Sequence, residues 1–295
     1  MKRNFFLAAS LCTALTSLTA WLYRPAPVQG FIAVGDSRIY YEVTGKGRPL
    51  ILLHGGFMDH RMWFHQADVL STQRMVITCD LRGSGLTQDG DGAYLMSEGI
   101  RILADSLHLK QFDLIGHSFG AIVALDMAIK YPDRVRRLVL YSPGSREWKP
   151  ELPGDSILRK SDARMREAYF VKKDTALVAE HFIRTWFDGP FRHPTESVRQ
   201  ERAYALRIAT DKARKGFRYE PILDSFPISP RLRDLYMPVL LVTGDLEMDR
   251  INAIADSFAT HIPGVRRAVV PGAAHMANME RYIDFNTVVS EFIGR

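Results

Sequence analysis

Cysteine is nearly absent from this 295-residue chain, which contains only Cys12 and Cys79. Cys12 lies in an apolar N-terminal stretch, so removal of that stretch would leave Cys79 alone and exclude an intramolecular disulfide. Internal repeats, low-complexity tracts and His/Cys/Asp clusters with metal-ligand spacing are also missing. With 46% hydrophobic and 24% charged residues, the chain is expected to be one large globular domain, which excludes disorder and a multi-span membrane protein.

A large surplus of positive charge is lacking as well. The formal net charge is +6, and residues 1–30 carry three basic residues, Lys2, Arg3 and Arg24, and no acid, which leaves +3 for residues 31–295. A charge that small predicts no nucleic-acid partner.

The N-terminus differs in kind from the rest of the chain. A basic start, residues 1–4, precedes an apolar stretch over 5–22. This order predicts an export signal within residues 1–30, cleaved before Phe31, and a periplasmic or secreted protein. The alternative is an uncleaved single-span anchor, because about 17 apolar residues suffice to cross a bilayer. Membrane contact is expected only through residues 1–30, if they are retained.

Strands and helices alternate from residue 31 onward. The pattern predicts strands over 37–44, 49–54, 75–80, 112–116, 135–141, 238–243 and 267–270, and helices over 59–70, 95–109, 119–131, 251–260 and 278–293. This alternation is typical of an α/β fold with a mostly parallel central sheet and helices on both faces.

Residues 144–234 interrupt this rhythm. Helices are expected over 156–170, 174–187 and 195–215, and the segment holds 19 Lys or Arg and 14 Asp or Glu. An insertion between two sheet strands is expected to form a helical lid over the carboxyl edge of the sheet, where ligands bind in open α/β folds. We call it the inserted segment. Its aromatic residues offer an apolar lining: Trp148, Phe182, Trp186, Phe187 and Phe191.

Ser118 is the candidate nucleophile. It stands in Gly116-His117-Ser118-Phe119-Gly120, which follows a predicted strand and opens a predicted helix. This G-x-S-x-G pattern indicates a serine in a strained turn, where a side chain at either flanking glycine would collide with the neighbouring strand or helix. Such a serine needs a base and an orienting acid, which follow it in the order acid, then histidine.

His275 is the candidate base, because it follows the last predicted strand in a loop of glycine and alanines. The acid is expected after the preceding strand, where Asp245, Glu247 and Asp249 all stand open as candidates. The other place for such an acid, after the strand ending at Tyr141, offers no carboxylate.

An oxyanion formed during acyl transfer requires backbone N–H donors. One is expected from Phe119, the residue after the nucleophile. The other is expected from His54-Gly55-Gly56-Phe57, with Gly56 favoured and Phe57 in reserve. His54 and His117 are expected to be structural.

These motifs together resemble those of single-domain α/β-hydrolase fold enzymes over residues 31–295. The resemblance is carried by HGGF, DLRGSG, GHSFG, GDLE and PGAAH, at 54–57, 80–85, 116–120, 244–247 and 271–275. It implies that Glu247, three residues after the glycine, is the acid, although this family most often has Asp there. It further implies acyl transfer from a small ester or lactone through Ser118, His275 and Glu247, with no cofactor and no metal.

The resemblance also defines the alternatives. C–C bond hydrolases, cofactor-free haloperoxidases and aminopeptidases share these motifs. A serine at the turn excludes the relatives that use aspartate there. The rival class is a non-catalytic binding protein of the same fold, and such proteins commonly lose the serine or the histidine, both of which this chain keeps.

Overall fold

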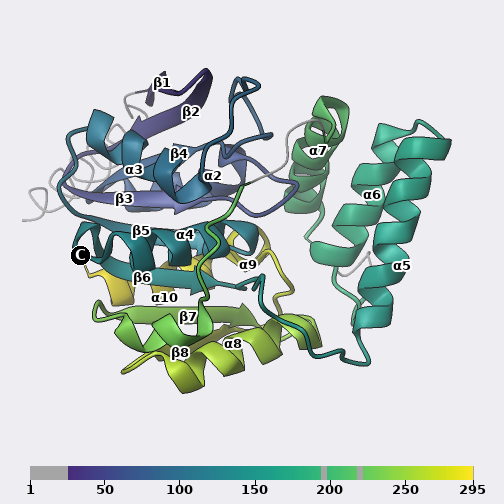
Figure 1. Ribbon diagram of the computed structural model, residues 1–295. Coiled ribbons are helices and arrows are strands. Elements are labelled where there is room, and N and C mark those ends of the chain that lie inside the picture. Colours follow the sequence, from purple (N-terminus) through teal and green to yellow (C-terminus); the bar gives the residue numbers. More distant parts are fainter. Residues whose placement is uncertain (1–25, 194–197, 218–221, 295) are drawn as a thin grey trace, which may run out of the picture.

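A central sheet organises the computed structural model, which describes residues 26–193, 198–217 and 222–294 (Figure 1). Within these residues the sheet has eight strands in the order β1-β2-β4-β3-β5-β6-β7-β8. β2 pairs antiparallel with β1 and β4, and every other pairing is parallel. The predicted α/β fold with a mostly parallel sheet is thereby confirmed.

The elements follow the predicted alternation closely. The strands are β1 Val28–Val34, β2 Ser37–Thr44, β3 Arg48–Leu53, β4 Arg74–Cys79, β5 Phe112–His117, β6 Val135–Tyr141, β7 Val239–Gly244 and β8 Arg266–Val270. The helices are η1 His60–Trp63, α2 Phe64–Leu70, α3 Met96–Ser106, α4 Phe119–Lys130, η2 Pro132–Arg134, α5 Asp155–Arg166, η3 Glu167–Val171, α6 Thr175–Trp186, α7 Arg199–Lys215, η5 Ser229–Asp234, α8 Asp249–His261, α9 Ala277–Glu280 and α10 Tyr282–Ile293.

The sheet is buried on both faces. In β3, Leu50 and Leu52 belong to the buried cluster that includes residues of α2 and α10, while Ile51 and Leu53 belong to the cluster that includes residues of α3, α4 and α8. All four side chains have 0% exposure. Their alternation explains why the strand is a continuous apolar run, as is typical of parallel strands covered on both sides.

β1 is the strand that the sequence patterns missed. Val28 to Gly30, assigned above to the leader, pair with Val43 to Tyr41 of β2. The described fold therefore begins before the expected boundary at residue 31. β1 is a partly exposed edge strand, joined to β2 by a tight turn at Gly35 (φ 62°). Its sequence therefore gives neither a clear alternation of apolar and polar residues nor a strong hairpin-turn signal. The predicted leader, residues 5–22, lies outside the described residues.

Two predicted helices are interrupted. The helix expected over 59–70 starts as a 3-10 turn, η1, before α2 begins at Phe64. The helix expected over 278–293 is divided into α9 and α10 at Arg281, whose backbone leaves the helical region (φ −126°, ψ 43°). None of the helices in the described part of the chain combines the length and hydrophobicity that a transmembrane span requires.

The inserted segment forms a separate layer. Figure 1 shows α5, α6 and α7 beside one another at one end of the sheet. α5 continues into the π-helical turn η3, and α7 is described from Arg199, since residues 194–197 lie outside the description. α5 and α6 contribute Asp162, Met165, Phe182 and Trp186 to a cavity that Ser118 also lines, at the carboxyl ends of the strands.

Candidate active site

Ser118 occupies the sharp turn that its flanking glycines predict. It lies between β5 and α4 with φ 52° and ψ −108°, a strained backbone for a non-glycine residue. A Cβ at Gly116 would come within 2.2 Å of the Gly120 carbonyl oxygen, and one at Gly120 within 2.4 Å of the Leu53 carbonyl oxygen. Only glycine therefore fits at either position, and the turn holds Ser118 at the end of the strand.

His275 and Glu247 form a buried pair. Nδ1 of His275 lies 2.8 Å from Oε2 of Glu247, and the two residues are 3% and 2% exposed. The other carboxylate oxygen, Oε1, accepts a hydrogen bond from the Met248 N–H at 2.9 Å. Because Nδ1 of His275 is engaged with the carboxylate, Nε2 is the ring nitrogen available to the cavity.

The structure places the other two candidate acids beside other residues. Oδ1 of Asp245 accepts a hydrogen bond from the Ala273 N–H at 3.2 Å. Asp249 begins α8, and a Cβ placed on Gly154 would lie 3.1 Å from its Oδ2, so its carboxylate faces the inserted segment. Of these three carboxylates, Glu247 is the one that the fold brings to His275.

A second set of contacts holds the backbone of His275. Its carbonyl oxygen accepts hydrogen bonds from the Tyr141 hydroxyl at 2.7 Å and from Nε2 of His117 at 2.8 Å. Burial, together with the neighbouring His275, keeps the pKa of His117 well below its ordinary value, so the ring is neutral and donates from Nε2. His117 is structural, as predicted. The role of Tyr141 was missed, because a buried aromatic residue at a strand end carries no sequence pattern of its own.

His54 is structural as well. It accepts a hydrogen bond from the Leu81 N–H through Nε2 at 2.9 Å and contacts the Gly55 carbonyl oxygen through Nδ1 at 2.8 Å. Burial lowers the pKa of this histidine. It therefore ties the end of β3 to the loop after β4.

A cavity of about 240 Å³ brings most of the predicted site residues together. Its lining consists of Gly56, Phe57, His117, Ser118, Phe119, Asp162, Met165, Phe182, Trp186, His275 and Met276. Glu247 is not in this lining and lies behind His275. The cavity thus exposes the candidate nucleophile and base to a ligand while the acid stays buried.

Both predicted oxyanion donors lie in this lining. A Cβ on Gly56 would be 3.7 Å from Cβ of Phe119, so the two backbone segments are adjacent. Phe119 is the first residue of α4, and N–H groups in a first helical turn have no acceptor within the helix. The reserve donor, Phe57, has φ 64° and also lines the cavity.

Only some of the aromatic residues of the inserted segment lie at the cavity. Trp186 lies with its ring 4.5 Å from that of His275, and the ring of Phe182 stacks on Phe57 at 4.8 Å. Phe187 is fully buried, Trp148 packs against the main core, and Phe191 is 56% exposed. The expected apolar lining is therefore supplied by two of the five. Asp162, a carboxylate in the same lining, was missed because nothing distinguishes it from other helical surface acids.

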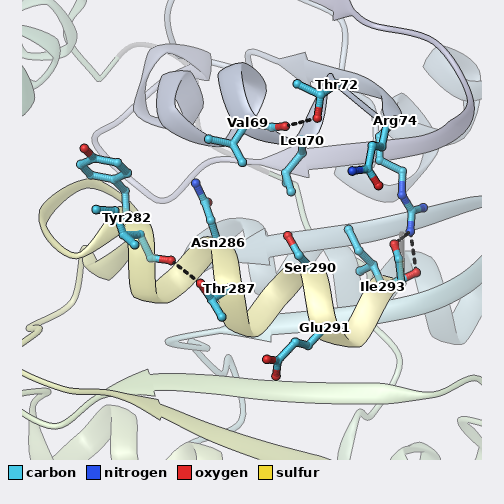
Figure 2. Close-up of a pocket in the computed structure, with 13 residues that line it drawn as sticks. Val69, Leu70, Thr72, Arg74, Tyr282, Asn286, Thr287, Ser290, Glu291 and Ile293 are labelled. Atoms are coloured by element: carbon cyan, nitrogen blue, oxygen red, sulfur yellow. Dashed lines mark hydrogen bonds between the residues drawn. The ribbon is translucent and has the colours of Figure 1, made fainter. Parts of the chain in front are cut away.

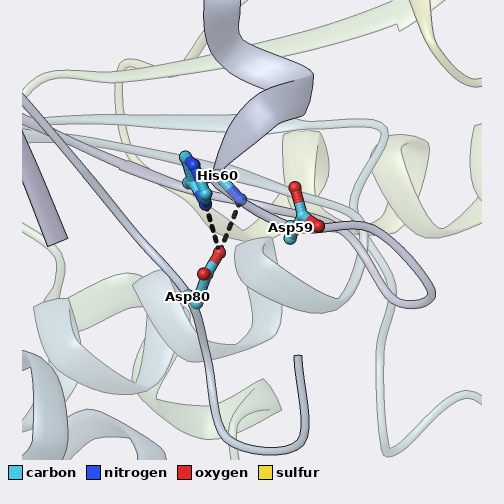
Figure 3. A group of neighbouring side chains, drawn as sticks. All are labelled: Asp59, His60 and Asp80. Carbon is cyan, nitrogen blue, oxygen red and sulfur yellow. Dashed lines mark hydrogen bonds and ion pairs between the residues drawn. The ribbon is translucent and has the colours of Figure 1, made fainter. Parts of the chain in front are cut away.

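A separate cluster of Asp59, His60 and Asp80 has donor atoms close enough for a metal ion (Figure 3). Its carboxylates already have partners. Oδ1 of Asp80 accepts hydrogen bonds from the His60 backbone N–H at 2.7 Å and contacts His60 Nδ1 at 2.8 Å, and Oδ2 accepts from the Leu86 N–H at 2.7 Å. Asp59 forms an ion pair with Arg61 at 2.7 Å. We therefore read the cluster as a structural network.

A cavity larger than the one at Ser118 lies elsewhere in the described part of the chain. It measures about 710 Å³ and lies between α2 and α10, at the amino end of β4, where Arg74 donates a hydrogen bond to the Ile293 carbonyl oxygen at 2.5 Å (Figure 2). Its lining contains none of the predicted site residues. Size alone therefore does not locate the candidate site.

Comparison with known proteins identifies the family. The model of the alpha/beta hydrolase fold family matches residues 48–282. The chain belongs to this family. The putative carbamate hydrolase RutD of Azorhizobium caulinodans is 26% identical over 270 residues, covering 88% of this chain and 96% of that protein. The 2-hydroxy-6-oxo-6-(2'-aminophenyl)hexa-2,4-dienoic acid hydrolase of Metapseudomonas resinovorans is 25% identical over 283 residues, 92% of each.

Solved structures agree on the fold. The carboxylesterase CesB of Bacillus subtilis matches with a TM-score of 0.72 at 23% identity, covering 94% of both chains. This member of the alpha/beta hydrolase family is thus similar to enzymes that hydrolyse different bonds. The protein is a hydrolase, and these relatives differ in the substrates for which they are named.

Proposed function

We propose that this α/β hydrolase cleaves a neutral carboxylic ester or lactone through a serine acyl-enzyme. One observation carries the proposal: the buried His275–Glu247 pair, 2.8 Å apart, lies at the cavity where the strained turn presents Ser118. A histidine oriented by a carboxylate is what converts a weakly nucleophilic serine hydroxyl into a reactive one.

In the proposed reaction, Oγ of Ser118 attacks the ester carbonyl carbon while Nε2 of His275 takes the hydroxyl proton. Glu247 holds the imidazole tautomer and stabilises its cation. The N–H groups of Gly56 and Phe119 receive the oxyanion, at the positive end of α4. His275 then gives its proton to the leaving alcohol oxygen, the Ser118 ester forms, and water hydrolyses that ester by the same route.

The charge of the cavity favours a neutral substrate. Asp162 lines it, and its lining among the described residues includes no lysine or arginine. Burial, opposed by Arg166, raises the pKa of Asp162, as expected for a carboxylate poor in compensating charge. The related dienoic acid hydrolase is named for a substrate that carries a carboxylate, for which the described lining of the cavity at Ser118 offers no lysine or arginine. A C–C bond hydrolase is therefore the less favoured reading.

The inserted segment is proposed to act as a lid, because α5 and α6 close one side of this cavity. Exclusion of water by such a layer strengthens electrostatic stabilisation of the oxyanion.

The test uses purified protein with a fluorophosphonate probe and with p-nitrophenyl acetate and butyrate. Wild type is expected to label and turn over, and Ser118→Ala to lose labelling and at least about 10⁴-fold in kcat. Ser142→Ala is the matched control. Ser142 also has a positive φ, 42°, follows the neighbouring strand β6 and lies outside the cavity lining, so its removal should leave labelling intact.

Labelling that persists in Ser118→Ala, or a folded wild type that neither labels nor hydrolyses, would refute the proposed nucleophile. A second assay compares the hypothesis of a neutral ester substrate with that of a carboxylate-bearing substrate of a C–C bond hydrolase. It measures turnover of p-nitrophenyl butyrate and of the p-nitrophenyl half ester of succinate. We expect at least about tenfold preference for butyrate, reduced in Asp162→Asn. Preference for the succinate would favour the C–C reading.

We also propose export through residues 1–30. Because Val28 to Gly30 pair with β2, a cut before Phe31 would remove part of β1. The mature chain is therefore expected to begin between residues 22 and 28. N-terminal sequencing of the protein from the periplasm or medium tests this, and a full-length chain in the membrane fraction would favour the anchor.

A further inference from the structure

A second cavity lies beyond the first, within the inserted segment. It measures about 450 Å³ and is lined by Asp162, Met165, Arg166, Tyr169, Phe170 and Phe217. Asp162 and Met165 also line the cavity at Ser118, so the two cavities meet at these side chains of α5. These two side chains therefore form the boundary between the inner and the outer cavity.

A series of neighbouring aromatic rings connects the two cavities. The ring of Phe217, in the outer cavity, lies 5.6 Å from that of Phe57, which stacks on Phe182 at 4.8 Å. Phe182 lies 6.5 Å from Trp186, whose ring is 4.5 Å from that of His275. A row of apolar surface thus extends from the outer cavity to the candidate base.

The volumes indicate what the outer cavity contributes. At about 240 Å³ the inner cavity falls below the range of about 300–1,000 Å³ typical of ligand sites, and addition of the outer one brings the total into that range. The exposed fractions of Phe170 and Phe217 are 58% and 45%, so the outer cavity presents large apolar side chains to solvent.

We propose that the two cavities form one binding path, in which the outer cavity takes the long apolar arm of an ester while the carbonyl group lies at Ser118. The inference rests on the proposed function and names its substrate class: medium-chain esters, with the arm on either the acyl or the alcohol side. Each methylene that leaves water along this path is expected to raise kcat/KM about fourfold.

The experiment measures kcat/KM of wild type for p-nitrophenyl acetate, butyrate and octanoate, below the concentrations at which they aggregate. Octyl acetate, followed by pH-stat against ethyl acetate, tests the alcohol side. We expect kcat/KM for octanoate to exceed that for butyrate, or kcat/KM for octyl acetate to exceed that for ethyl acetate, by at least about 100-fold. The series that shows the preference identifies the side that carries the arm.

Two variants test the route itself. Met165→Trp narrows the passage and is expected to abolish the chain-length preference, measured as the ratio of kcat/KM for octanoate to that for acetate. Phe217→Ala removes part of the outer wall and is expected to lower octanoate turnover about tenfold. Phe191→Ala is the matched control, since Phe191 is an exposed phenylalanine of the inserted segment outside both linings, and it should behave as wild type.

The outcomes separate the two proposals. If short esters are hydrolysed in a Ser118-dependent way without any chain-length preference, or if the preference survives both Met165→Trp and Phe217→Ala, this inference is wrong and the proposed function stands. If no ester of either series is hydrolysed, the proposed function fails and the inference fails with it.

Discussion

Two histidine–carboxylate pairs in this molecule look alike and are used differently. His275 and Glu247 lie 2.8 Å apart, as do His60 and Asp80, and all four side chains are largely buried. The two pairs differ in what surrounds the rest of each histidine ring. Nε2 of His60 faces a further carboxylate, Glu42, at 3.5 Å, whereas the ring of His275 lines the cavity of Ser118.

The loop around Asp80 completes that contrast. The motif Asp80–Gly85 wraps around its first residue: a Cβ on Gly85 would lie 2.1 Å from Oδ2 of Asp80, and the Thr87 hydroxyl donates to the Asp80 carbonyl oxygen at 2.6 Å. The glycines of this motif thus serve a structural turn. Residue type and burial are shared by both pairs, and it is the position of the His275 ring at the cavity of Ser118 that makes this pair a candidate for catalysis.

The largest effect on activity is expected when the His275–Glu247 pair is broken. Glu247→Gln is expected to lower kcat on the order of 10⁴-fold with the fold intact, because an amide favours the wrong imidazole tautomer. The measurement is p-nitrophenyl acetate turnover beside a circular dichroism spectrum. Asp245→Asn and Asp249→Asn are the controls and should stay within about threefold. If Asp249→Asn is the variant that loses activity, the assignment of the acid is wrong.

Breaking the second pair should affect stability instead. Asp80→Asn leaves His60 buried beside a neutral partner, and we expect a loss of about 3 kcal/mol in the free energy of unfolding. The activity of the remaining folded protein should change little. Urea unfolding and active-site titration give the two quantities. A large fall in kcat per folded molecule would show that this pair also serves catalysis.

Tyr141 holds the same histidine in a different way, because its hydroxyl contacts the backbone of His275 and not the ring. Tyr141→Phe removes one of two hydrogen bonds to the His275 carbonyl oxygen and is expected to lower kcat about tenfold with little change in KM. Steady-state kinetics measure both parameters. A change confined to KM would argue against a positioning role.

The His60 pair should also be visible in the pH dependence of stability. Burial acts to lower the pKa of His60, but Asp80, with Asp59 and Glu42, outweighs it and raises that pKa above its ordinary value. The stabilisation is therefore complete below about pH 6.5 and is lost as pH rises through the raised pKa. Between pH 6 and 9, wild type should lose on the order of 1 kcal/mol more than His60→Gln in urea unfolding. An equal loss of unfolding free energy in wild type and His60→Gln would contradict this explanation.

The smallest expected effect is that of a chelator. Because the carboxylates of Asp59 and Asp80 are engaged by Arg61, His60 and Leu86, EDTA is expected to change neither turnover nor the melting temperature. Thermal unfolding and p-nitrophenyl acetate assays with and without EDTA test this. A lower melting temperature that Zn²⁺ or Mn²⁺ restores would make the cluster a metal site.

Much of the fold could be read from the sequence because the decisive patterns are local. The apolar run of β3 and the glycines around Ser118 each report a constraint set by neighbouring residues. β1 could not be read in this way, since an edge strand is defined by its partner, β2, and three of its residues looked like the end of a leader.

For the candidate site, the sequence alone predicts the turn that holds Ser118 and the candidate base, because the turn depends on short-range backbone geometry and His275 follows the last predicted strand. It left three carboxylates open, and only the tertiary structure placed Glu247 against His275, Asp245 on Ala273 and Asp249 beside Gly154. The same holds for Tyr141, Asp162 and the outer cavity. These features arise where segments far apart in the chain pack together, and such packing leaves no periodic trace in the sequence.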